Sequence, residues 1–416
     1  MKCCGRSLRG PSGSLSLGIT ATDQIVSNAS NALIVLLVAG VSTSADFGLF
    51  AIAWSVANFI VAVYRSAFAV QLSMAAHTPA QLGKDTSSSV TAVALSAPVP
   101  IAVIILGGYL AIGESSSIVL ILALVAPFVL VQDTLRFSAI AFGRTLLTLL
   151  SDSLWLAASL TGILWRILGQ PKPADIVLLW ALGALVAMAV LVIGLRPSLE
   201  LSGLSNWLRE TLQGRLHLSL GALALGASLP VGSIAIGAFA GSDVLATLAG
   251  GAQLMAPVNT AAALFSIGLL PRAAKISNQR RVQLFSIAGL SVAAGALIWA
   301  ATLLSLPETL GQALLGQTWE STRSILVALG PQYSIGTMAL AGILLLTSLQ
   351  LTRAVLITSV ASAVARVGLY SVVAAMVGTA LSISVAETLL LLVGAVAVWL
   401  IARRSLATLP RMARDR

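Results

Sequence analysis

Residues 174–195 read ADIVLLWALGALVAMAVLVIGL, and Asp175 is the one charged residue in this run. A hydrocarbon core about 30 Å thick is crossed by about 20 apolar residues of α-helix, so the run predicts a membrane-spanning helix. Similar apolar runs, separated by polar breaks, recur along the chain, and we predict twelve spans. They are expected near residues 21–42, 47–72, 88–112, 117–142, 145–168, 174–195, 215–239, 243–270, 284–305, 321–349, 353–377 and 381–402.

The composition of the whole chain agrees with a membrane protein. Of its 416 residues, 58% are hydrophobic and 9% are charged, and the mean hydropathy is +0.99. An ordinary soluble domain has roughly a quarter of its residues charged, so soluble, disordered and disulfide-scaffold proteins are excluded. Aromatic residues are 5% and glycines number 35, which favours closely packed helices over a β-barrel with aromatic girdles. We predict an all-α polytopic membrane protein with two six-helix lobes around a central cavity.

The distribution of Lys and Arg predicts the orientation. If the N-terminus is cytoplasmic, 18 of the 24 basic residues fall in inside segments, as the positive-inside rule expects. We therefore predict a multi-pass protein of the plasma (inner) membrane with both termini cytoplasmic, and membrane lipids as partners of its basic loops rather than nucleic acid. The expected inside residues are Lys2, Arg6, Arg9, Lys84, Arg144, Arg196, Arg209, Arg215, Arg272, Lys275, Arg280, Arg281, Arg353, Arg403, Arg404, Arg411, Arg414 and Arg416.

A polar connection divides the chain into two halves. We expect a tail at 1–20, an N-lobe at 21–195, a linker at 196–216, a C-lobe at 217–402 and a basic tail at 403–416. Asp46 and Asp243 open corresponding spans of a weak repeat offset by about 197 residues, as in parallel-repeat transporters. Prolines within spans either form hinges around a cavity or reflect the ordinary abundance of proline in membrane helices. They are Pro98, Pro100, Pro127, Pro230, Pro257 and Pro331.

Amide side chains recur on one face of the first span. Gln24, Asn28 and Asn31 follow the spacing i, i+4, i+7, which places them together on a helix. We predict that they line a hydrophilic substrate path, although buried amides also join helices by hydrogen bonds. The same prediction covers Asn58 in the second span and Gln253 and Asn259 in the eighth.

Arg366 lies about halfway along the eleventh span, at a depth where a charge requires a partner, a cavity or a ligand. Glu387 in the twelfth span is its expected ion-pair partner. An ion pair and a substrate-binding role are compatible, and both remain open from the sequence.

Further charges are expected nearer the membrane surfaces. Arg65 and Arg136 lie in the inner thirds of their spans, where they are expected to extend to the cytoplasmic surface. Asp133 and Arg136, at i and i+3, are positioned to pair with each other. Asp152, Asp23 and Glu387 are candidates for carrying a coupling ion, with Asp23 expected at the wet end of its span.

The sequence shows no catalytic or metal-binding constellation. His77 and His217 have no companion ligands at metal-binding spacing, and the Gly83-Lys84-Asp85 segment lacks the upstream glycine of a phosphate-binding loop. We expect no enzymatic activity, no cofactor and no metal. Transport would then draw on an ion gradient, a substrate gradient or a partner.

Several short motifs resemble the multidrug/oligosaccharidyl-lipid/polysaccharide (MOP) exporter superfamily, and within it the bacterial polysaccharide flippases. They are DQIVSN at 23–28, DFGLF at 46–50, APVN at 256–259 followed by LPR at 270–272, and LGQTW at 315–319. The resemblance implies alternating access and a polyprenyl-linked saccharide as substrate. It implies that Arg65, Arg366 and the amides bind its pyrophosphate and glycan, with a glycan polymerase or glycosyltransferases as partners.

Two other functions compete with this expectation. A cation-coupled drug exporter of the same fold would depend on an acid such as Asp23 or Asp152 and on aromatics, which are few in the spans. A membrane-embedded glycan polymerase or transferase would need large outer loops with catalytic residues, and no predicted outer loop is long.

Overall fold

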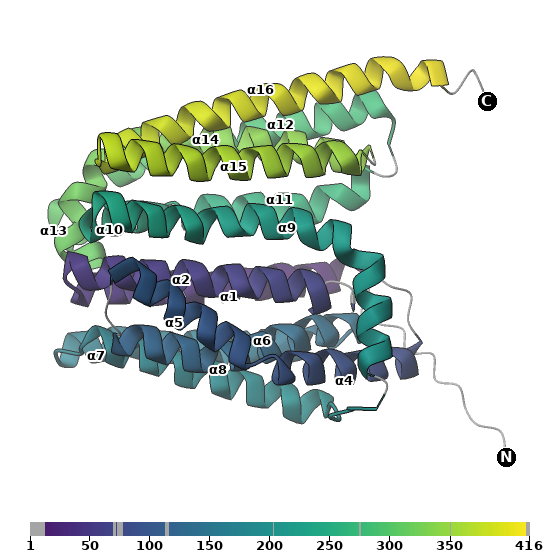
Figure 1. Ribbon diagram of the computed structural model, residues 1–416, viewed down its shortest axis with the longest axis horizontal. Helices are drawn as coiled ribbons and strands as arrows, with labels where there is room; N and C mark the ends of the chain where they lie inside the picture. The colour runs from purple at the N-terminus through teal and green to yellow at the C-terminus, as the bar shows by residue number, and fades with distance from the viewer. Residues whose placement is uncertain are drawn as a thin grey trace.

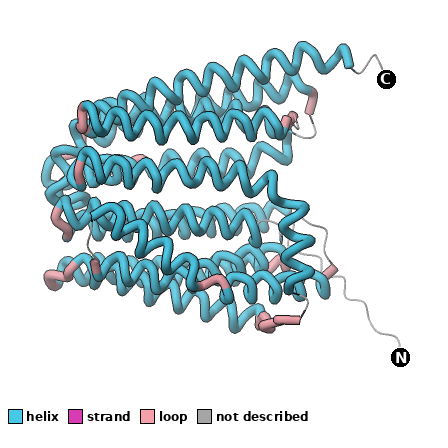
Figure 2. Tube along the Cα trace, in the orientation of Figure 1, coloured by secondary structure: helices cyan, strands magenta, loops and turns pink. Residues whose placement is uncertain are grey.

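A computed structural model describes residues 13–69, 72, 78–112, 116–202, 204–273, 276–349 and 351–412. These residues form helices joined by short connections, with no strand among them (Figures 1 and 2). The predicted all-α class is therefore confirmed. The elements are α1 (Gly13–Val41), α2 (Ser44–Tyr64), a π-helical turn η1 (Arg65–Ala69), α4 (Pro79–Leu95), α5 (Pro98–Ile112), α6 (Ser117–Ala141), α7 (Thr145–Leu168), α8 (Pro173–Leu195), α9 (Leu204–Ala240), α10 (Ser242–Leu254), α11 (Ala256–Ala273), α12 (Asn278–Leu304), α13 (Glu308–Leu315), the 3-10 turn η2 (Gly316–Thr318), α14 (Trp319–Ser348), α15 (Thr352–Met376) and α16 (Ala380–Met412).

Within the described ranges, nine helices are long and apolar enough to cross a membrane, and the bent pair α4 and α5 makes a tenth. The apolar segments Gly226–Ala240 and Ala256–Phe265 are shorter and lie in the seventh and eighth predicted spans. All twelve predicted spans thus correspond to helical segments.

Two of the spans that contain proline are broken near it. The third span bends by 43° between α4 and α5, where Pro98 and Pro100 begin the second helix. The eighth span breaks at Met255, two residues before Pro257. Proline lacks a backbone N–H, so each break removes one helical hydrogen bond. Pro127, Pro230 and Pro331 lie inside continuous helices, where the hinge interpretation does not apply.

The third span begins earlier than predicted. Helix α4 starts at Pro79, where Thr78 and Gln81 form a capping box, and Lys84 therefore lies on a helix rather than in a loop. The first turns of α4 are polar, so a search for apolar runs did not include them. Hydrogen bonds to other protein groups allow their hydroxyls to lie inside the bundle. Ser87 Oγ, for example, accepts a hydrogen bond from the backbone N–H of Ser198 at 3.1 Å.

The helices form two lobes, α1–α8 below and α9–α16 above in Figure 1. The first part of α9 crosses from one lobe to the other, so the predicted linker 196–216 is helical from Leu204 onward. Trp207 anchors this crossing, because its Nε1–H donates to Asp85 of α4 at 3.0 Å and its ring stacks on Phe68 with centroids 6.3 Å apart.

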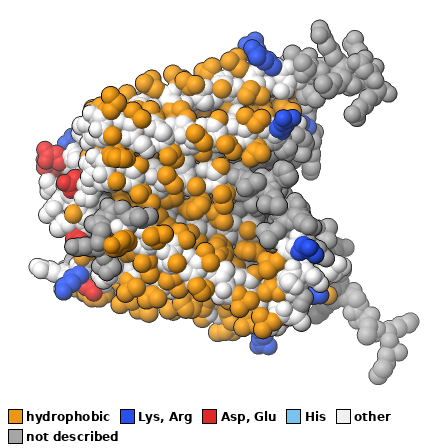
Figure 3. Space-filling model, in the orientation of Figure 1, with side chains coloured by type: hydrophobic (Ala, Val, Ile, Leu, Met, Phe, Trp, Pro, Cys, Tyr) orange, Lys and Arg blue, Asp and Glu red, His pale blue; other side chains and the backbone are white. Residues whose placement is uncertain are grey.

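The two ends of the bundle differ in charge. We call the end where α1 begins and α16 ends the terminal end, and the end that holds α13 the distal end (Figure 1). Figure 3 shows an apolar belt between them, with acidic side chains at the distal end beside a few basic ones, and basic side chains at the terminal end. Large apolar side chains on this belt, such as Ile298 at 68% and Val393 at 67% exposure, fit a lipid-facing surface.

Some predicted residues cannot be assessed structurally. The backbone of Lys2, Cys3, Cys4, Arg6, Arg9, His77, Lys275, Arg414 and Arg416 and the side chains of Arg215, His217, Arg272 and Arg411 lie outside the described residues.

The lobes contact each other closely at the distal end. A Cβ atom added to Gly48 of α2 would lie 2.5 Å from the carbonyl oxygen of Ser242 at the start of α10. A second contact between the lobes lies nearby, where Arg166 Nη1 of α7 donates a hydrogen bond to the carbonyl of Ala313 in α13 at 2.8 Å. Gly316 adopts a φ of 57° and would place a Cβ 3.0 Å from the carbonyl oxygen of Ala39. These glycines allow backbone-to-backbone closure of the distal end.

We predict that Gly48→Val opens the distal end. The added methyl groups meet the backbone of Ser242 only when the lobes are closed, and such overpacking costs about 1–3 kcal/mol, or roughly a 5- to 150-fold shift in the closed-to-open ratio. Spin labels on Ala45→Cys and Asp243→Cys, in a Cys3→Ser/Cys4→Ser background, should report longer distances. Gly295→Val is the matched control, since a Cβ there meets nothing within 4 Å; equal distance distributions in both variants would refute the contact's role.

Candidate functional site

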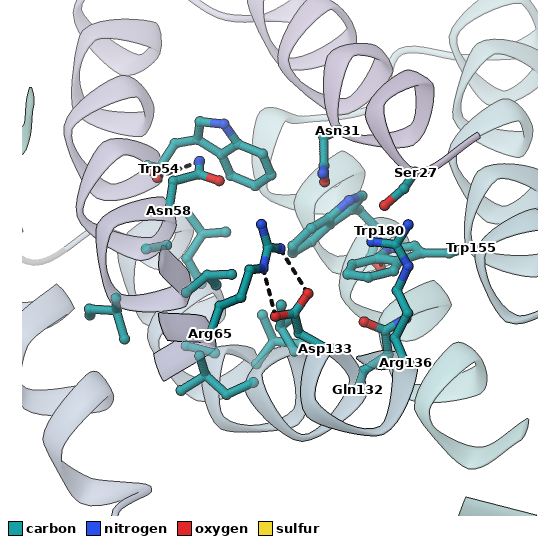
Figure 4. A pocket seen from close by; sticks show the side chains of 18 residues that line it. Ser27, Asn31, Trp54, Asn58, Arg65, Gln132, Asp133, Arg136, Trp155 and Trp180 are labelled. Carbon is teal, nitrogen blue, oxygen red and sulfur yellow. Dashed lines mark hydrogen bonds and ion pairs between the residues drawn. The ribbon is translucent and has the colours of Figure 1, made fainter. Parts of the chain in front are cut away.

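The N-lobe encloses a polar pocket of about 80 Å³ between α1, α2, α6, α7 and α8. Figure 4 shows Arg65 and Asp133 facing each other across it. The Arg65 guanidinium donates to both carboxylate oxygens of Asp133, at 2.9 Å from Nε and 2.8 Å from Nη2. Arg65 is the first residue of the π-helical turn that ends the straight part of α2. Such turns interrupt the regular helix register and are frequent at functional sites.

A second, deeper ion-pair group surrounds Arg136 of α6. Its Nη2 lies 2.6 Å from Asp23 Oδ2 of α1, and its Nε lies 3.1 Å from Asp152 Oδ2 of α7. The side chains of Arg136, Asp23 and Asp152 are 7%, 0% and 1% exposed. Gln132, one turn earlier on α6, donates to Asp152 Oδ1 at 3.0 Å. One arginine therefore holds three helices together in the interior of the lobe.

The two groups together form what we call the N-lobe charge cluster: Asp23, Arg65, Asp133, Arg136 and Asp152. It contains three carboxylates and two guanidinium groups, so its ionised form carries one net negative charge. Asp23 Oδ1 is buried and has no hydrogen-bond partner among the described residues. An uncompensated buried carboxylate is costly in a membrane, so the cluster favours one additional proton or cation.

Tryptophans close the pocket. Trp155 and Trp180 have ring centroids 5.0 Å apart, and Trp155 Nε1 donates to the carbonyl of Trp180 at 3.0 Å. Trp54 of α2 meets Trp180 edge to face at 5.2 Å. Trp54 also lines the cavity between the lobes, so it separates the pocket from that cavity. The aromatic residues of this chain are few, but three of them converge beside the charge cluster.

The cavity between the lobes has a volume of about 500 Å³ and carries a polar group on its C-lobe wall. Glu387 of α16 accepts hydrogen bonds from the Tyr370 hydroxyl and, at 2.9 Å, from Gln332 Nε2. Arg366 lies behind it, with Nε 3.3 Å from Glu387 Oε1. The predicted ion pair between Arg366 and Glu387 is thus present, and Glu387, Tyr370 and Gln332 line the cavity while Arg366 does not.

The predicted amides divide between the two spaces. Gln24 Nε2 donates to Asn28 at 3.1 Å, Asn28 Nδ2 donates to Thr260 across the lobes at 3.2 Å, and Asn31 lines the N-lobe pocket. Gln253 and Asn259 line the central cavity, and Asn58 lines both spaces. Gln24 and Asn28 therefore act through hydrogen bonds between residues, whereas the other four face a pocket.

Three sequence predictions about charges are wrong. Asp133 and Arg136 do not pair with each other, because Asp133 faces Arg65 and Arg136 faces Asp23 and Asp152. Arg136 does not extend to the surface, since its side chain is 7% exposed between Asp23 and Asp152, whereas the Arg65 side chain is 40% exposed and pairs with Asp133. Asp23 is fully buried rather than at a wet end.

Several residues of the site were not predicted from the sequence. Few aromatics were expected in the lumen, whereas Trp54, Trp155 and Trp180 line the N-lobe pocket. Gln332 and Tyr370 were not among the predicted residues either. One feature of the sequence does point to the cluster. Gln132, Asp133 and Arg136 lie close together in an otherwise apolar span, and several polar groups inside one span require partners on other helices.

Solved structures with the same architecture are transporters. An inward-facing multidrug resistance MATE family transporter of the MOP superfamily matches with a TM-score of 0.63 at 13% identity, over 97% of each chain. An outward-facing structure of such a transporter matches with a TM-score of 0.58 at 13% identity, over 98% of this chain and 100% of that one. This chain has the fold of the MATE transporters.

Another MATE-like match is a MOP superfamily transporter from Pyrococcus furiosus, for which a binding pocket of reverse polarity is said to suggest a different function. Its TM-score is 0.53 at 14% identity, over 95% of this chain and 96% of that one. No protein-family model and no curated protein matches the sequence. The expected fold is therefore confirmed, and the apolar helices of the described residues fit a multi-pass membrane protein.

We predict that the two central residues of the charge cluster differ in their effect on stability. Arg136→Gln leaves Asp23 and Asp152 buried without a cation and should cost about 3–5 kcal/mol. Asp152→Asn leaves two carboxylates for two guanidinium groups and should change stability by less than about 1 kcal/mol. Thermal unfolding of the purified protein in detergent measures both; a larger loss in Asp152→Asn than in Arg136→Gln would contradict the charge count.

Proposed function

We propose that this protein is a proton-coupled exporter of small organic cations, working by alternating access in the plasma membrane. The observation that carries the proposal is the N-lobe charge cluster, with its buried excess carboxylate beside tryptophans. Such an exporter is expected to need an acid and aromatic residues, and the presence of Asp23, Asp152 and three tryptophans in and around the N-lobe pocket supports the proposal. The solved structures of this fold described as multidrug transporters agree with it.

The cluster has the properties of a proton carrier. Asp152 and Asp23 share one guanidinium, so protonating either of them leaves Arg136 paired and removes the excess negative charge. A proton adds to a single carboxylate oxygen, whereas a metal ion needs several oxygen ligands around it, and the Arg136 guanidinium already lies between Asp23 and Asp152. We therefore assign the coupling ion as a proton.

The pocket is placed to exchange this proton for a substrate. Trp54 and Asn58 of α2 line both the N-lobe pocket and the central cavity, so a change in the cluster can be transmitted through α2. Arg65, at the end of α2, is bound to Asp133, and protonation that rearranges these ion pairs would move the helix that forms the distal contact through Gly48. Protonation state and distal closure are thereby linked through one helix.

The central cavity has groups suited to an aromatic cation. Trp54 offers an aromatic face, for which a cation has an attraction of about 0.5–2 kcal/mol. Glu387 lines the cavity with a carboxylate that Tyr370 and Gln332 hold in place. Arg366 balances its charge, so Glu387 offers the cation a hydrogen-bond acceptor rather than a net negative charge. Arg65, Arg136 and Arg366 each contact a carboxylate, which reduces their capacity to bind an anionic cargo. With the basic terminal end in the cytoplasm, the cavity would load from inside.

The direct test uses purified protein in liposomes with ethidium as the probe cation. We expect an imposed pH gradient to drive ethidium movement in the wild type and to have no effect in Asp152→Asn, which should retain a stable fold. Glu308→Gln is the matched control, because Glu308 is an exposed carboxylate at the distal end. Equal gradient dependence in wild type and Asp152→Asn would refute coupling through the cluster.

Glu387 tests the substrate end of the proposal separately. A hydrogen bond to a charged group contributes about 1.5–3 kcal/mol, so Glu387→Gln should raise the KM for ethidium by about 10- to 100-fold. The dependence on the pH gradient should remain. Tyr370→Phe, which keeps the carboxylate, should have a smaller effect, and an unchanged KM in Glu387→Gln would exclude it from cation binding.

Export of a lipid-linked saccharide remains a second candidate. The amides on the cavity wall, Asn58, Gln253, Asn259 and Gln332, favour it because they can bond to sugar hydroxyls. Its partners would be the glycan polymerase or glycosyltransferases expected from the sequence. Loss of surface glycan in an Arg366→Ala strain, with unchanged sensitivity to organic cations, would favour this function over the proposed one.

A further inference from the structure

An apolar groove of about 570 Å³ runs along the outside of the C-lobe, away from both the N-lobe pocket and the central cavity. Helix α14 forms its floor, and α12 and α16 form its walls. The volume lies in the range of about 300–1,000 Å³ typical of small-molecule sites. Its lining is apolar except at the terminal end, where Arg403 completes it.

The shape of the groove depends on a close approach of α14 and α16. Met338, Gly342 and Leu345 share one face of α14 at i, i+4 and i+7. A Cβ on Gly342 would lie 2.7 Å from Val398 Cγ1 and 3.2 Å from Trp399 Nε1, so only glycine allows this packing. Trp399 Nε1 donates to the Met338 carbonyl at 3.0 Å, which fixes the indole in the groove.

The positions of Trp399 and Arg403 relative to the membrane surface fit a bound lipid molecule. Trp399 lies one helical turn, about 6 Å, before Arg403, and tryptophan concentrates at the membrane–water interface with arginine just outside it. An acyl chain would therefore lie against Val396, Leu345 and Met338, while the headgroup would lie beside Arg403.

Charge decides which headgroup fits. Two of the helices that meet here carry arginines at this end, and of these Arg280 near the start of α12 and Arg403 near the end of α16 are exposed. The neighbouring segments 276–285, 343–357 and 398–412 contain no Asp or Glu. Helix α12 begins at Asn278, so the positive end of its dipole lies at the same level. Arg281 holds this corner together by donating to the carbonyls of Ile276 at 3.1 Å and Ser348 at 3.0 Å.

We propose that the groove binds one anionic phospholipid, with an acyl chain along α14 and the phosphate at Arg403 and Arg280. The basic rim favours an anionic headgroup over a zwitterionic one. The groove holds the acyl chain of one particular lipid molecule, which a basic surface alone would not do. The site does not depend on the proposed cargo or on the coupling proton.

Native mass spectrometry of the full chain released from nanodiscs, with phosphatidylglycerol and phosphatidylcholine as probes, tests the proposal. We expect a retained phosphatidylglycerol that phosphatidylcholine does not replace. Each of Arg403→Gln and Arg280→Gln should weaken it about fivefold, since a basic residue near an anionic lipid surface contributes about 1 kcal/mol. Val396→Trp, which changes no charge, should also weaken binding because the larger ring fills the groove.

Lys84→Gln is the matched control, because Lys84 is exposed at the same end of the molecule but on the N-lobe. Unchanged lipid binding in this control, with losses in Arg403→Gln and Val396→Trp, supports the site. An equal loss of phosphatidylglycerol binding in Lys84→Gln, or equal retention of the two lipids, would show that the basic surface attracts lipids in general. Either result would overturn the proposal. A second copy of the chain in the groove, seen as a dimer that Val396→Trp dissociates, would overturn it as well.

Discussion

A charged arginine in the interior of a membrane domain requires carboxylates beside it, and the N-lobe is arranged to meet this requirement at Arg136. Between transmembrane helices the lipid is as apolar as the side chains it contacts, so apolar burial alone does not select which helices become neighbours. Asp23 and Asp152 do so, by bringing α1 and α7 to the same guanidinium on α6. Arg65 and Asp133 add α2 to this group. The position of the distal contact at Gly48 follows from the position of α2.

The C-lobe is held together in a different way. Helices α12, α14 and α16 approach through glycines such as Gly289, which faces Ala341 and Met338, and Gly342, which faces Val398 and Trp399. Its described ion pair, Arg366 with Glu387, joins α15 to α16 at the cavity wall. The lobes thus have the same general architecture, and both contain close contacts at glycines, but the ion pairs that join four helices lie in the N-lobe.

The sequence predicted the features that depend on one helix at a time. Apolar run length located the spans, but the prolines within spans did not show in advance that the helix would break near Pro98 and Pro257 and continue through the others. The Arg366–Glu387 pair was also predictable, because both residues lie within consecutive spans joined by a short turn. The partners of Arg136 were not predictable, since they depend on which distant helices become its neighbours. The nearby Asp133 was the obvious choice by spacing, but it is already bound to Arg65.

The same reason explains the aromatic residues. A content of 5% indicated a lumen poor in aromatics, but composition does not report where residues converge. Trp54, Trp155 and Trp180 come from three helices and meet beside the charge cluster. At 13–14% identity the fold of the solved transporters does not determine the cargo of this one, so its chemistry has to be inferred from this site.

Proton release on substrate binding tests the central claim most directly. Purified protein in a weakly buffered detergent solution, with a pH indicator, should release about one proton per chain when ethidium is added, because cation binding in the central cavity is coupled through α2 to loss of the proton that the cluster's excess carboxylate holds. Asp152→Asn, in which that excess is removed, should bind ethidium and release none. Binding without proton release in the wild type, or equal release in both proteins, would contradict the account.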